Sequence, residues 1–373
     1  MRNVYLDNAA TTPLREEVIE VMISVLQESF GNPSSLHSFG RKAKNILESA
    51  RKTIAKIINT SAAEIIFTSS ATEATNWILR SAVKDLGVKR IISSKMEHHA
   101  TLYTIEVLER EYGIIIEYLP VAEKGVLEIS RLENLLKESI PTLVSLMHVN
   151  NETGEILDIA KVGNLCQSYN AYFHCDAVQS IGKMTFNLQE LAVDFLVASA
   201  HKFHGPKGVG FAYIKKGILI QPLLYGGEQE KGYRAGTEAV HQIAGMSKAL
   251  EISYLHLQKE KKYISELKSY CMESLGKAFP KIKSIGHDTL YTIINVVLPM
   301  ETTKTPMLLF ALDMKGIAVS RGSACQSGSS KPSHVLAEIL PVEEQQNPNI
   351  RISFSHFNTK EDVDLLVAAL KAI

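Results

Sequence analysis

Residues Asp194–Gly210, D-F-L-V-A-S-A-H-K-F-H-G-P-K-G-V-G, combine a short apolar run, a lysine and a glycine-rich loop. Phe195–Ala198 predict a buried strand, and the Gly/Pro-rich loop follows it. Lys202 stands where this strand ends, beside Ser199 and His201. Because ligands of α/β folds bind at the carboxyl ends of parallel strands, we expect Lys202 to face a pocket. Burial lowers the pKa of an amine and makes it a nucleophile, so Lys202 is a candidate Schiff-base lysine.

A lysine in such a loop is equally often a solvated side chain, but a second polar cluster favours the functional interpretation. Tyr172–Cys175 predict another short strand, which ends in Asp176, and Gln179 follows three residues later. Pyridoxal phosphate (PLP) needs an acid against its pyridinium nitrogen and a lysine at its aldehyde. Asp176 and Lys202 suit these two roles, so the two strand ends together indicate a PLP site.

Length, charge and cysteine usage narrow the class of protein. A chain of 373 residues predicts a large α/β domain with a smaller one. Lys+Arg and Asp+Glu both number 40, and this zero net charge argues against nucleic-acid or anionic-membrane partners. Met1–Ala10 lacks the apolar core of a signal peptide, so we expect a soluble, cytoplasmic protein. The cysteines show neither a C-x-x-C pair nor a zinc spacing: Cys166, Cys175, Cys271 and Cys325.

Apolar periodicity predicts short strands that alternate with helices along most of the chain. Strands are expected at Val4–Leu6, Glu64–Thr68, Arg90–Ser93, Ile114–Leu119, Thr142–His148, Tyr172–Cys175, Phe195–Ala198, Gly208–Ile214, Thr292–Leu298, Ala318–Ser320 and Ile350–Ser355. The longest expected helices cover about Arg15–Glu28, Gly40–Ile58 and Glu238–Ala278, and a last helix begins near Asn358 or Thr359 and ends at Ala372. Such alternation predicts a mainly parallel sheet with helices on both faces.

Polar clusters recur at the carboxyl ends of these strands, after Thr68, Ser93, Val149, Cys175 and Ala198. That repetition predicts one shared pocket. The cluster Ser69-Ser70-Ala71-Thr72 enters a helix, whose first N–H groups form a ready anion site for a cofactor phosphate. Helix capping is the more common reason for hydroxyl residues at this place, so the cluster alone does not decide between the two.

With these residues in view, the chain resembles the cysteine desulfurases, PLP enzymes of the class V aminotransferase group, from Tyr5 to about Asp364. The matching blocks follow in order: Y-L-D-N-A-A-T-T-P, G-N-P-S-S-L-H-S-F-G, T-E-A-T-N, E-H-H-A, H-V-N-N-E-T-G, D-A-V-Q-S, S-A-H-K, R-A-G-T, G-S-A-C and R-I-S. The resemblance implies the PLP-dependent transferase fold type I. It also implies a large PLP-binding domain at 15–255, a small α/β domain at 256–373, and a segment 1–14 that packs with the small domain.

The resemblance implies a role for each candidate site residue. Lys202 would bind the cofactor covalently and move the Cα proton of the substrate. Asp176 would pair with the pyridinium nitrogen, and His98 would stack on the ring as an acid–base group. The other implied contacts are Gln179 at the ring hydroxyl, Ala71, Thr72, Ser199 and His201 at the phosphate, Asn151 at the cofactor and the substrate carboxylate, and Arg351 at the substrate carboxylate. Ser70 stands where the family commonly has glycine, which puts the phosphate contacts in question.

Two further residues connect the implied site to partners. Thr237 resembles the residue that such enzymes lend across a dimer interface to the phosphate of the partner, which implies a homodimer. Cys325, in the polar stretch Ser320–Ser330, would take the sulfur of L-cysteine as a persulfide while L-alanine leaves. The G-S-A-C sequence resembles the subclass with a long, flexible cysteine loop. That subclass delivers sulfur to an acceptor protein, for iron–sulfur cluster assembly or other products, and Cys325 is then a candidate transient iron–sulfur ligand.

Two other hypotheses remain open at this point. A selenocysteine lyase, or another PLP-dependent aminotransferase or lyase, would keep the fold and change the chemistry. A metal-binding protein would use His98, His99, His201, His204 and Cys325. Gly205-Pro206 argues against the helix that the His201/His204 spacing needs, and no resident metal is therefore expected.

Overall fold

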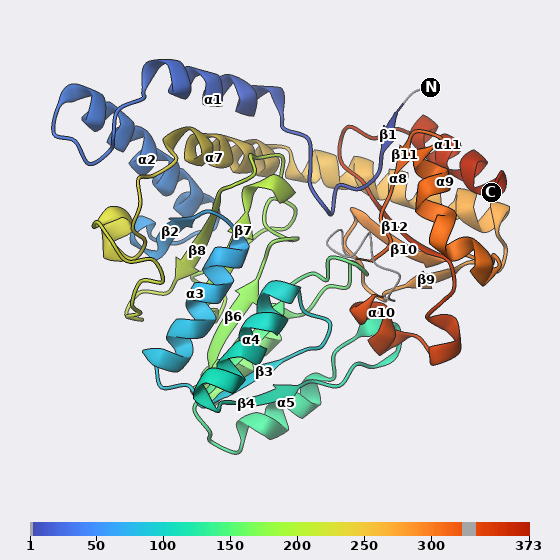
Figure 1. Cartoon of the computed structure of the whole chain (residues 1–373), viewed down its shortest axis with the longest axis horizontal. Coiled ribbons are helices and arrows are strands. Elements are labelled where there is room, and N and C mark those ends of the chain that lie inside the picture. Colours follow the sequence, from blue (N-terminus) through green and yellow to red (C-terminus); the bar gives the residue numbers. More distant parts are fainter. Residues whose placement is uncertain (1–2, 323–332) are drawn as a thin grey trace.

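The computed structural model describes residues 3–322 and 333–373. A seven-stranded sheet lies at the centre of its larger part, in the order β2-β8-β7-β6-β5-β3-β4 (Figure 1). Its strands are β2 (Ile65–Thr68), β3 (Arg90–Ser93), β4 (Ile115–Tyr118), β5 (Thr142–Met147), β6 (Tyr172–Asp176), β7 (Phe195–Ser199) and β8 (Gly210–Ile214). Strand β8 runs antiparallel to both of its neighbours, and the other pairs are parallel. The prediction of a mainly parallel, mixed α/β sheet is confirmed.

Helices cover both faces of this sheet because successive side chains of a strand point to opposite sides. In β7, for example, Phe195 packs into one core and Leu196 into the other. The Phe195 face carries α3 (Ala71–Lys84) and α4 (His99–Tyr112). The opposite face carries α1 (Glu16–Glu28), α2 (Ser38–Ile57), α5 (Ile129–Leu136), α6 (Ile159–Ser168) and α7 (Val240–Leu255).

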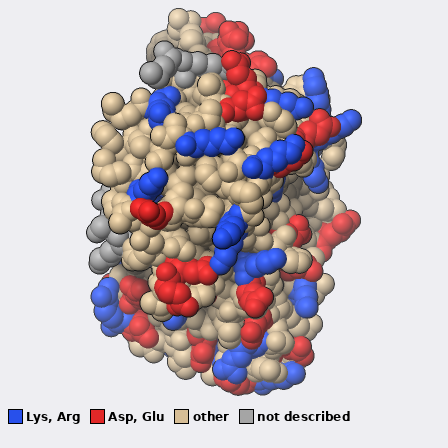
Figure 2. Space-filling model, turned by 90° about the vertical axis from the view of Figure 1, so that its right-hand side faces the viewer, with Lys and Arg blue, Asp and Glu red and all other residues tan. Residues whose placement is uncertain are grey.

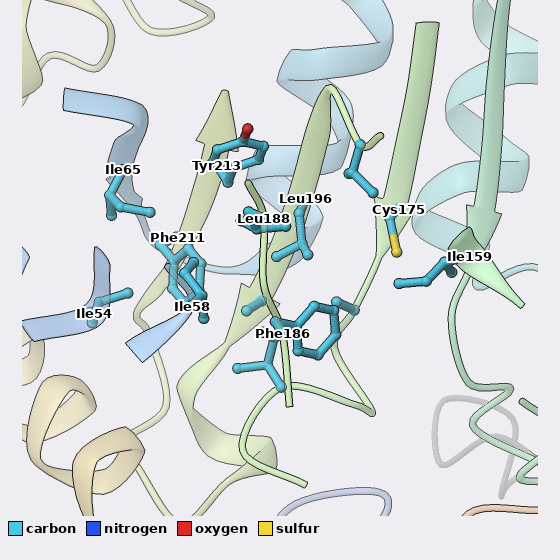
Figure 3. Close-up of a cluster of buried hydrophobic side chains, with 14 of the residues drawn as sticks. Ile54, Ile58, Ile65, Ile159, Cys175, Phe186, Leu188, Leu196, Phe211 and Tyr213 are labelled. Atoms are coloured by element: carbon cyan, nitrogen blue, oxygen red, sulfur yellow. The ribbon is translucent and has the colours of Figure 1, made fainter. Parts of the chain in front are cut away.

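The core on this second face is shown in part in Figure 3, where Ile54 of α2, Phe211 of β8 and Leu196 of β7 converge. All three side chains are fully buried. Cys175 of β6 lies in the same cluster, as a small apolar side chain would. Burial of side chains of this size stabilises the fold by about 1.5–3 kcal/mol each, which holds the strand ends in a fixed arrangement.

A second core lies under a smaller, three-stranded sheet in the order β12-β10-β9. The elements of this part are β9 (Lys283–Ile285), β10 (Ile293–Val297), β12 (Asn349–Ser353), α8 (Leu257–Ala278), α9 (Leu308–Asp313), α10 (His334–Ile339) and α11 (Lys360–Lys371). Strand β1 (Val4–Tyr5) pairs with β11 (Ile317–Ala318), and Val4 and Leu6 are buried in this second core. The division at 14/15 and 255/256 remains a prediction.

The long helical region predicted at about Glu238–Ala278 is confirmed, and it consists of α7 and α8 with an interruption at His256. His256 has φ −102° and ψ 5°, outside the α-helical range. Its N–H still bonds to the carbonyl of Ile252, so α7 ends on a satisfied backbone group, and its carbonyl accepts from the Glu260 N–H in the first turn of α8. The sequence contains no glycine or proline at this position, which is why the break was not predicted.

Lysine and arginine side chains alternate with aspartate and glutamate over the face drawn in Figure 2, without a field of one sign. This distribution agrees with the zero net charge of the chain. Within residues 3–322 and 333–373, none of the helices combines the length and the apolar character needed to cross a membrane.

Candidate active site

A cavity of about 270 Å³ lies at the edge where the carboxyl ends of the parallel strands meet. The turns after β2, β3, β5, β6 and β7 all contribute to its wall. It is lined by ten of the predicted site residues: Ala71, Thr72, His98, Asn151, Asp176, Gln179, Ser199, His201, Lys202 and Arg351. The structure therefore brings together the polar strand ends that the sequence placed far apart.

Lys202 ends the short η3 turn (Ala200–Lys202) directly after β7. Its Nζ donates hydrogen bonds to the carbonyls of Ala9 at 2.8 Å and Ala10 at 2.7 Å. Thr12 holds this N-terminal segment in place, because its N–H and its hydroxyl both donate to the carbonyl of His201 at 2.9 Å. The amine is thus directed by backbone oxygens of a segment near the N-terminus, more than 190 residues away in the sequence.

Asp176 is the last residue of β6, and its side chain is buried at the wall of the cavity. Burial raises the pKa of this carboxyl to about 6, although the Val178 N–H and the charge of Lys202 act in the opposite direction. The Val178 N–H donates to Oδ1 at 3.0 Å, which fixes the orientation of the carboxyl group. A cation placed against Asp176 would find an oriented, poorly hydrated partner.

His98 is the N-cap of α4, and its Nδ1 accepts a hydrogen bond from the Ala100 N–H at 3.1 Å. This bond assigns the proton of the neutral ring to Nε2. Burial, together with the charges of Lys202 and His334, lowers the pKa of His98 to about 4. At neutral pH the imidazole is therefore uncharged and presents an N–H donor at Nε2.

The first turn of α3 offers an anion site in the same cavity. Ser70 caps this helix, and its hydroxyl accepts from the Glu73 N–H at 3.2 Å. The oxygen of Ser70 is thus engaged with the helix, while the N–H groups of Ala71 and Thr72 stand in the first turn. Thr75, one turn further, has a buried hydroxyl oxygen without a hydrogen-bond partner among the described residues, and it also lines the cavity. Orphaned donors at a helix N-terminus fit a phosphate.

His201 lies on the other side of this anion site. Its Nδ1 is 3.2 Å from the hydroxyl oxygen of Thr11. Burial and the charges of Lys202, Lys207 and Lys183 lower the pKa of His201 to about 4, so the ring is neutral at pH 7. The phosphate contacts proposed for His201 would therefore be hydrogen bonds rather than ion pairs.

Arg351 of β12 reaches the cavity from the smaller sheet and is 1% exposed. Its Nη1 donates to the carbonyl of Asn151 at 2.8 Å, and its Nη2 donates to Oδ1 of Asp7 at 2.7 Å. Its Nε is buried and has no hydrogen-bond partner among the described residues. A guanidinium group held at two corners in this way retains N–H groups for a carboxylate.

Two predicted site residues remain, and Thr237 is not among the residues that line the cavity. Thr237 is exposed, in the segment between η4 (Gln229–Gly232) and α7. Cys325 lies outside the described residues. The other cysteines, Cys166, Cys175 and Cys271, are free and buried, as expected for packing residues. Burial raises the pKa of Cys271 to about 12, so this thiol is inert near neutral pH.

The sequence interpretation missed several residues of the site. Ala9 and Ala10 supply the carbonyls that bind Lys202, and Lys183 donates to the side chain of Gln179. The D-N-A-A-T-T-P block was among the quoted motifs, but small apolar residues that act through their backbone oxygens leave no side-chain signal. Lys183 follows Gln179 by one helical turn, and this i, i+4 spacing is the only local signal that could have revealed it.

Known proteins resemble this chain over its whole length. The aminotransferase class-V family model matches residues 4–366. A protein of Dictyoglomus turgidum named cysteine desulfurase IscS is 43% identical, with coverage of 100% of this chain and 94% of the relative. A protein of the same name from Methanosarcina thermophila is 40% identical, over 99% of this chain and 91% of the relative.

Solved structures agree with the sequence relatives. A structure described as a NifS-like protein superposes with a TM-score of 0.91 at 37% identity, covering 100% of this chain and 99% of the other. A second, described as SspA in complex with cysteine, superposes with a TM-score of 0.82 at 31% identity over 95% of this chain and 100% of the other.

Proposed function

This chain belongs to the class-V aminotransferase family, and we propose that it performs the cysteine desulfurase reaction with the residues that meet in the cavity. It is a PLP-dependent enzyme that converts L-cysteine to L-alanine and transfers the sulfur onward. The observation that carries the proposal is the meeting of Lys202, Asp176 and Arg351 in one cavity. Asp176 ends β6, Lys202 follows β7, and Arg351 lies within β12 of the smaller sheet.

The residues of the cavity fit PLP. Ala71 and Thr72 would bind the phosphate, with Ser199 and His201 beside them. Asp176 would face the ring nitrogen, Gln179 the ring oxygen, and His98 the ring face. When bound, PLP acts as an electron sink that labilises bonds at the Cα of an amino acid.

Each protein group then has a defined task in the reaction. Arg351 binds the substrate carboxylate, with Asn151 beside it, and so orients the amino acid. Lys202 would hold the cofactor through its amine, and this amine would also move the Cα proton of the substrate. His98, neutral with its proton on Nε2, donates or accepts a proton at the reacting face.

Cys325 completes the reaction as the nucleophile. Its thiolate attacks the sulfur of the bound cysteine, an S–S bond forms, and the C–S bond breaks. The electron pair of the C–S bond remains with the substrate carbon, which is protonated and leaves as L-alanine. The resulting persulfide is passed to a sulfur acceptor, which we propose to be a protein of iron–sulfur cluster assembly in the cytoplasm.

The function is tested by spectroscopy, labelling and product analysis. We expect an absorbance band of the Lys202-bound cofactor that borohydride fixes on Lys202, as mapped by mass spectrometry of the peptides. With L-cysteine and dithiothreitol, the enzyme should form alanine and sulfide in equal amounts. Cys325→Ser should keep the cofactor band and lose both products. Alanine formation that survives in Cys325→Ser would contradict the role of Cys325, and amino transfer to 2-oxo acids would favour an aminotransferase.

A homodimer is the second part of the proposal. Large apolar side chains are exposed on α1, on α2 and in the connection between them: Ile19, Ile23, Leu26, Phe30, Leu36 and Phe39. Leu36 is 90% exposed and Phe30 is 73% exposed, which is unusual for side chains of this size in a monomer. A second copy of the chain would cover them and would bring its Thr237 to the phosphate site.

Mixed dimers test the exchange of Thr237. We expect Thr237→Ala and Lys202→Ala homodimers each to be impaired, and the hybrid of the two to regain one intact site. If Thr237 acts across the interface, that site combines Lys202 of one subunit with Thr237 of the other. A hybrid without recovery, or a protein that sediments as a monomer, would contradict the proposal.

A further inference from the structure

A second lysine stands behind the cavity. Lys183 follows Gln179 by four residues in the turn that leaves β6, where the Ile181 N–H and the Met184 N–H bond to the carbonyls of Ala177 and Ser180. Gly182 in this turn has φ 81°, and a Cβ there would lie 2.6 Å from Cβ of Phe203. The absence of a side chain at Gly182 therefore lets the turn pack directly against the residue that follows Lys202.

The ammonium group of Lys183 is part of a chain of hydrogen bonds that ends at Lys202. Nζ of Lys183 donates to Oε1 of Gln179 at 3.2 Å, and Nε2 of Gln179 donates to the carbonyl of Ala9 at 2.8 Å. The same Ala9 carbonyl accepts from Nζ of Lys202 at 2.8 Å. A small cavity of about 20 Å³ separates the two lysines from the smaller sheet and is lined by both.

This arrangement determines which way the amide of Gln179 faces. A protonated lysine has only donors and the Ala9 carbonyl only accepts, so both neighbours place the oxygen of Gln179 towards Lys183. Nε2 then faces Ala9, and one of its two N–H groups donates to the Ala9 carbonyl. The second N–H is left for the larger cavity that Gln179 lines. With the amide reversed, an oxygen would face the Ala9 carbonyl and an NH₂ group would face an ammonium.

We propose that Lys183 is a positioning residue of the active site, which holds the amide of Gln179 so that an N–H, and not an oxygen, faces the ring oxygen of the cofactor. This inference rests on the proposed function, because it assumes PLP in the cavity. The ring oxygen of PLP carries negative charge when it is ionised and needs a donor. Lys183 also places a positive charge behind that donor.

The charge environment of Lys183 agrees with a position close to the reacting amine. Burial, with the charges of Lys202 and Arg351, lowers the pKa of Lys183 to about 7. The titratable groups around Lys183 and Lys202 are Asp176, His98, His201, His204, Arg351, Glu260 and Tyr291. Removal of a cation from this set favours the protonated form of the nitrogen that joins Lys202 to the cofactor.

The test compares Lys183→Met with Lys183→Arg in the PLP-loaded enzyme. Loss of one oriented donor should raise the dissociation constant of PLP roughly three- to tenfold. The pH at which the cofactor absorbance changes should rise by roughly half a unit, because a like charge is lost. Lys183→Arg keeps a donor and a charge. Its dissociation constant for PLP and the pH of its absorbance change should therefore lie close to the wild-type values. Lys161→Met makes the same replacement at an exposed position of α6 and should change neither.

A double-mutant cycle separates positioning from a general charge effect. In a Gln179→Ala background, Lys183→Met should change the affinity for PLP by no more than about twofold, since its partner is gone. An effect as large as in the wild-type background would overturn the inference, and so would unchanged affinity and spectrum in Lys183→Met. If Lys183→Met does not fold, Lys183→Leu, which also lacks a donor, takes its place in the same cycle. A wild-type protein that binds no PLP would instead refute the proposed function.

Discussion

At the scale of single residues, the chemistry of the site follows from burial next to a few oriented partners. Asp176 is buried and has an N–H partner at Oδ1, and burial raises its pKa to about 6. The acid is thus only partly ionised in the cofactor-free protein at mildly acidic pH. A bound cation would stabilise the carboxylate and lower this pKa, so cofactor binding and the ionisation of Asp176 must be coupled.

The first prediction concerns this coupling. Below pH 6 the protonated Asp176 cannot pair with a pyridinium cation, so PLP affinity should rise with pH by up to about tenfold per unit and level off above pH 6. Asp176→Asn should bind PLP weakly with a flatter profile. Absorbance titrations of the cofactor-free protein from pH 5 to 8 measure both. An unchanged pH profile in Asp176→Asn would contradict the assignment.

The same carboxyl should affect the stability of the cofactor-free protein. Its pKa is raised above the ordinary value of 3.8 in the folded state, so the unfolded chain loses this proton first as pH rises. The contribution of Asp176 to stability therefore falls between about pH 4 and pH 6 and stays low above that range. Asp176→Asn should remove this fall, which urea unfolding at pH 5 and pH 7.5 would show.

At the scale of elements, the anion site depends on how closely β8 approaches the start of α3. A Cβ on Gly210 would clash first with the carbonyl oxygen of Ala198 in β7. It would also lie 3.1 Å from the backbone carbon of Ser70 and 3.2 Å from the backbone nitrogen of Ala71. The antiparallel strand β8, which lies between β2 and β7, thus presses its first residue against the helix N-terminus. This contact sets the position of the N–H groups of Ala71 and Thr72.

The second prediction compares two glycines. Gly210→Ala should displace the first turn of α3 and weaken PLP binding at least tenfold, because the N–H groups of Ala71 and Thr72 would no longer point at the phosphate. Gly276 lies in α8 with no atom within 4 Å of an added Cβ. Gly276→Ala should leave PLP binding unchanged and stabilise the protein by up to about 1 kcal/mol. PLP titration and urea unfolding of both variants give the comparison, and equal PLP affinities would contradict it.

At the scale of the whole molecule, the N-terminal segment joins the two cores at the cavity. Val4 and Leu6 are buried in the smaller core, Asp7 pairs with Arg351, and Ala9 and Ala10 bind Lys202 of the larger part. Asp7 also accepts a hydrogen bond from the Ser320 hydroxyl at 2.8 Å. Arg351 and Lys202 are thus both held by residues of the segment Asp7–Ala10.

The third prediction removes this link. Asp7→Ala leaves the buried guanidinium of Arg351 without its carboxylate, which should cost roughly 3 kcal/mol of unfolding free energy. The KM for L-cysteine should rise because Arg351 is no longer held at Nη2. The exposed pair Lys248–Glu251 supplies the control, since Glu251→Ala should change stability by less than about 0.5 kcal/mol. Urea unfolding and steady-state kinetics measure both, and a stable Asp7→Ala enzyme with unchanged KM would contradict the link.

What the sequence by itself determined is local. Predicted ranges of four to seven residues located every strand of the large sheet, and β3 was predicted with its observed bounds, Arg90–Ser93. Asp176 and Lys202 were identified because polar residues at the end of a buried strand are a short-range pattern. The capping residue Thr359 of the last helix was also one of the two predicted.

Only the tertiary structure decided how distant segments meet. The Ala9 carbonyl and Lys202 are 193 residues apart in the chain, and Asp7 and Arg351 are 344 residues apart. The place of β8 between β2 and β7, the break at His256 and the amide orientation of Gln179 are further examples. Periodicity and capping report on neighbours within one or two turns, whereas these contacts arise from packing two cores against each other. They are therefore properties of the folded chain that no single stretch of it encodes.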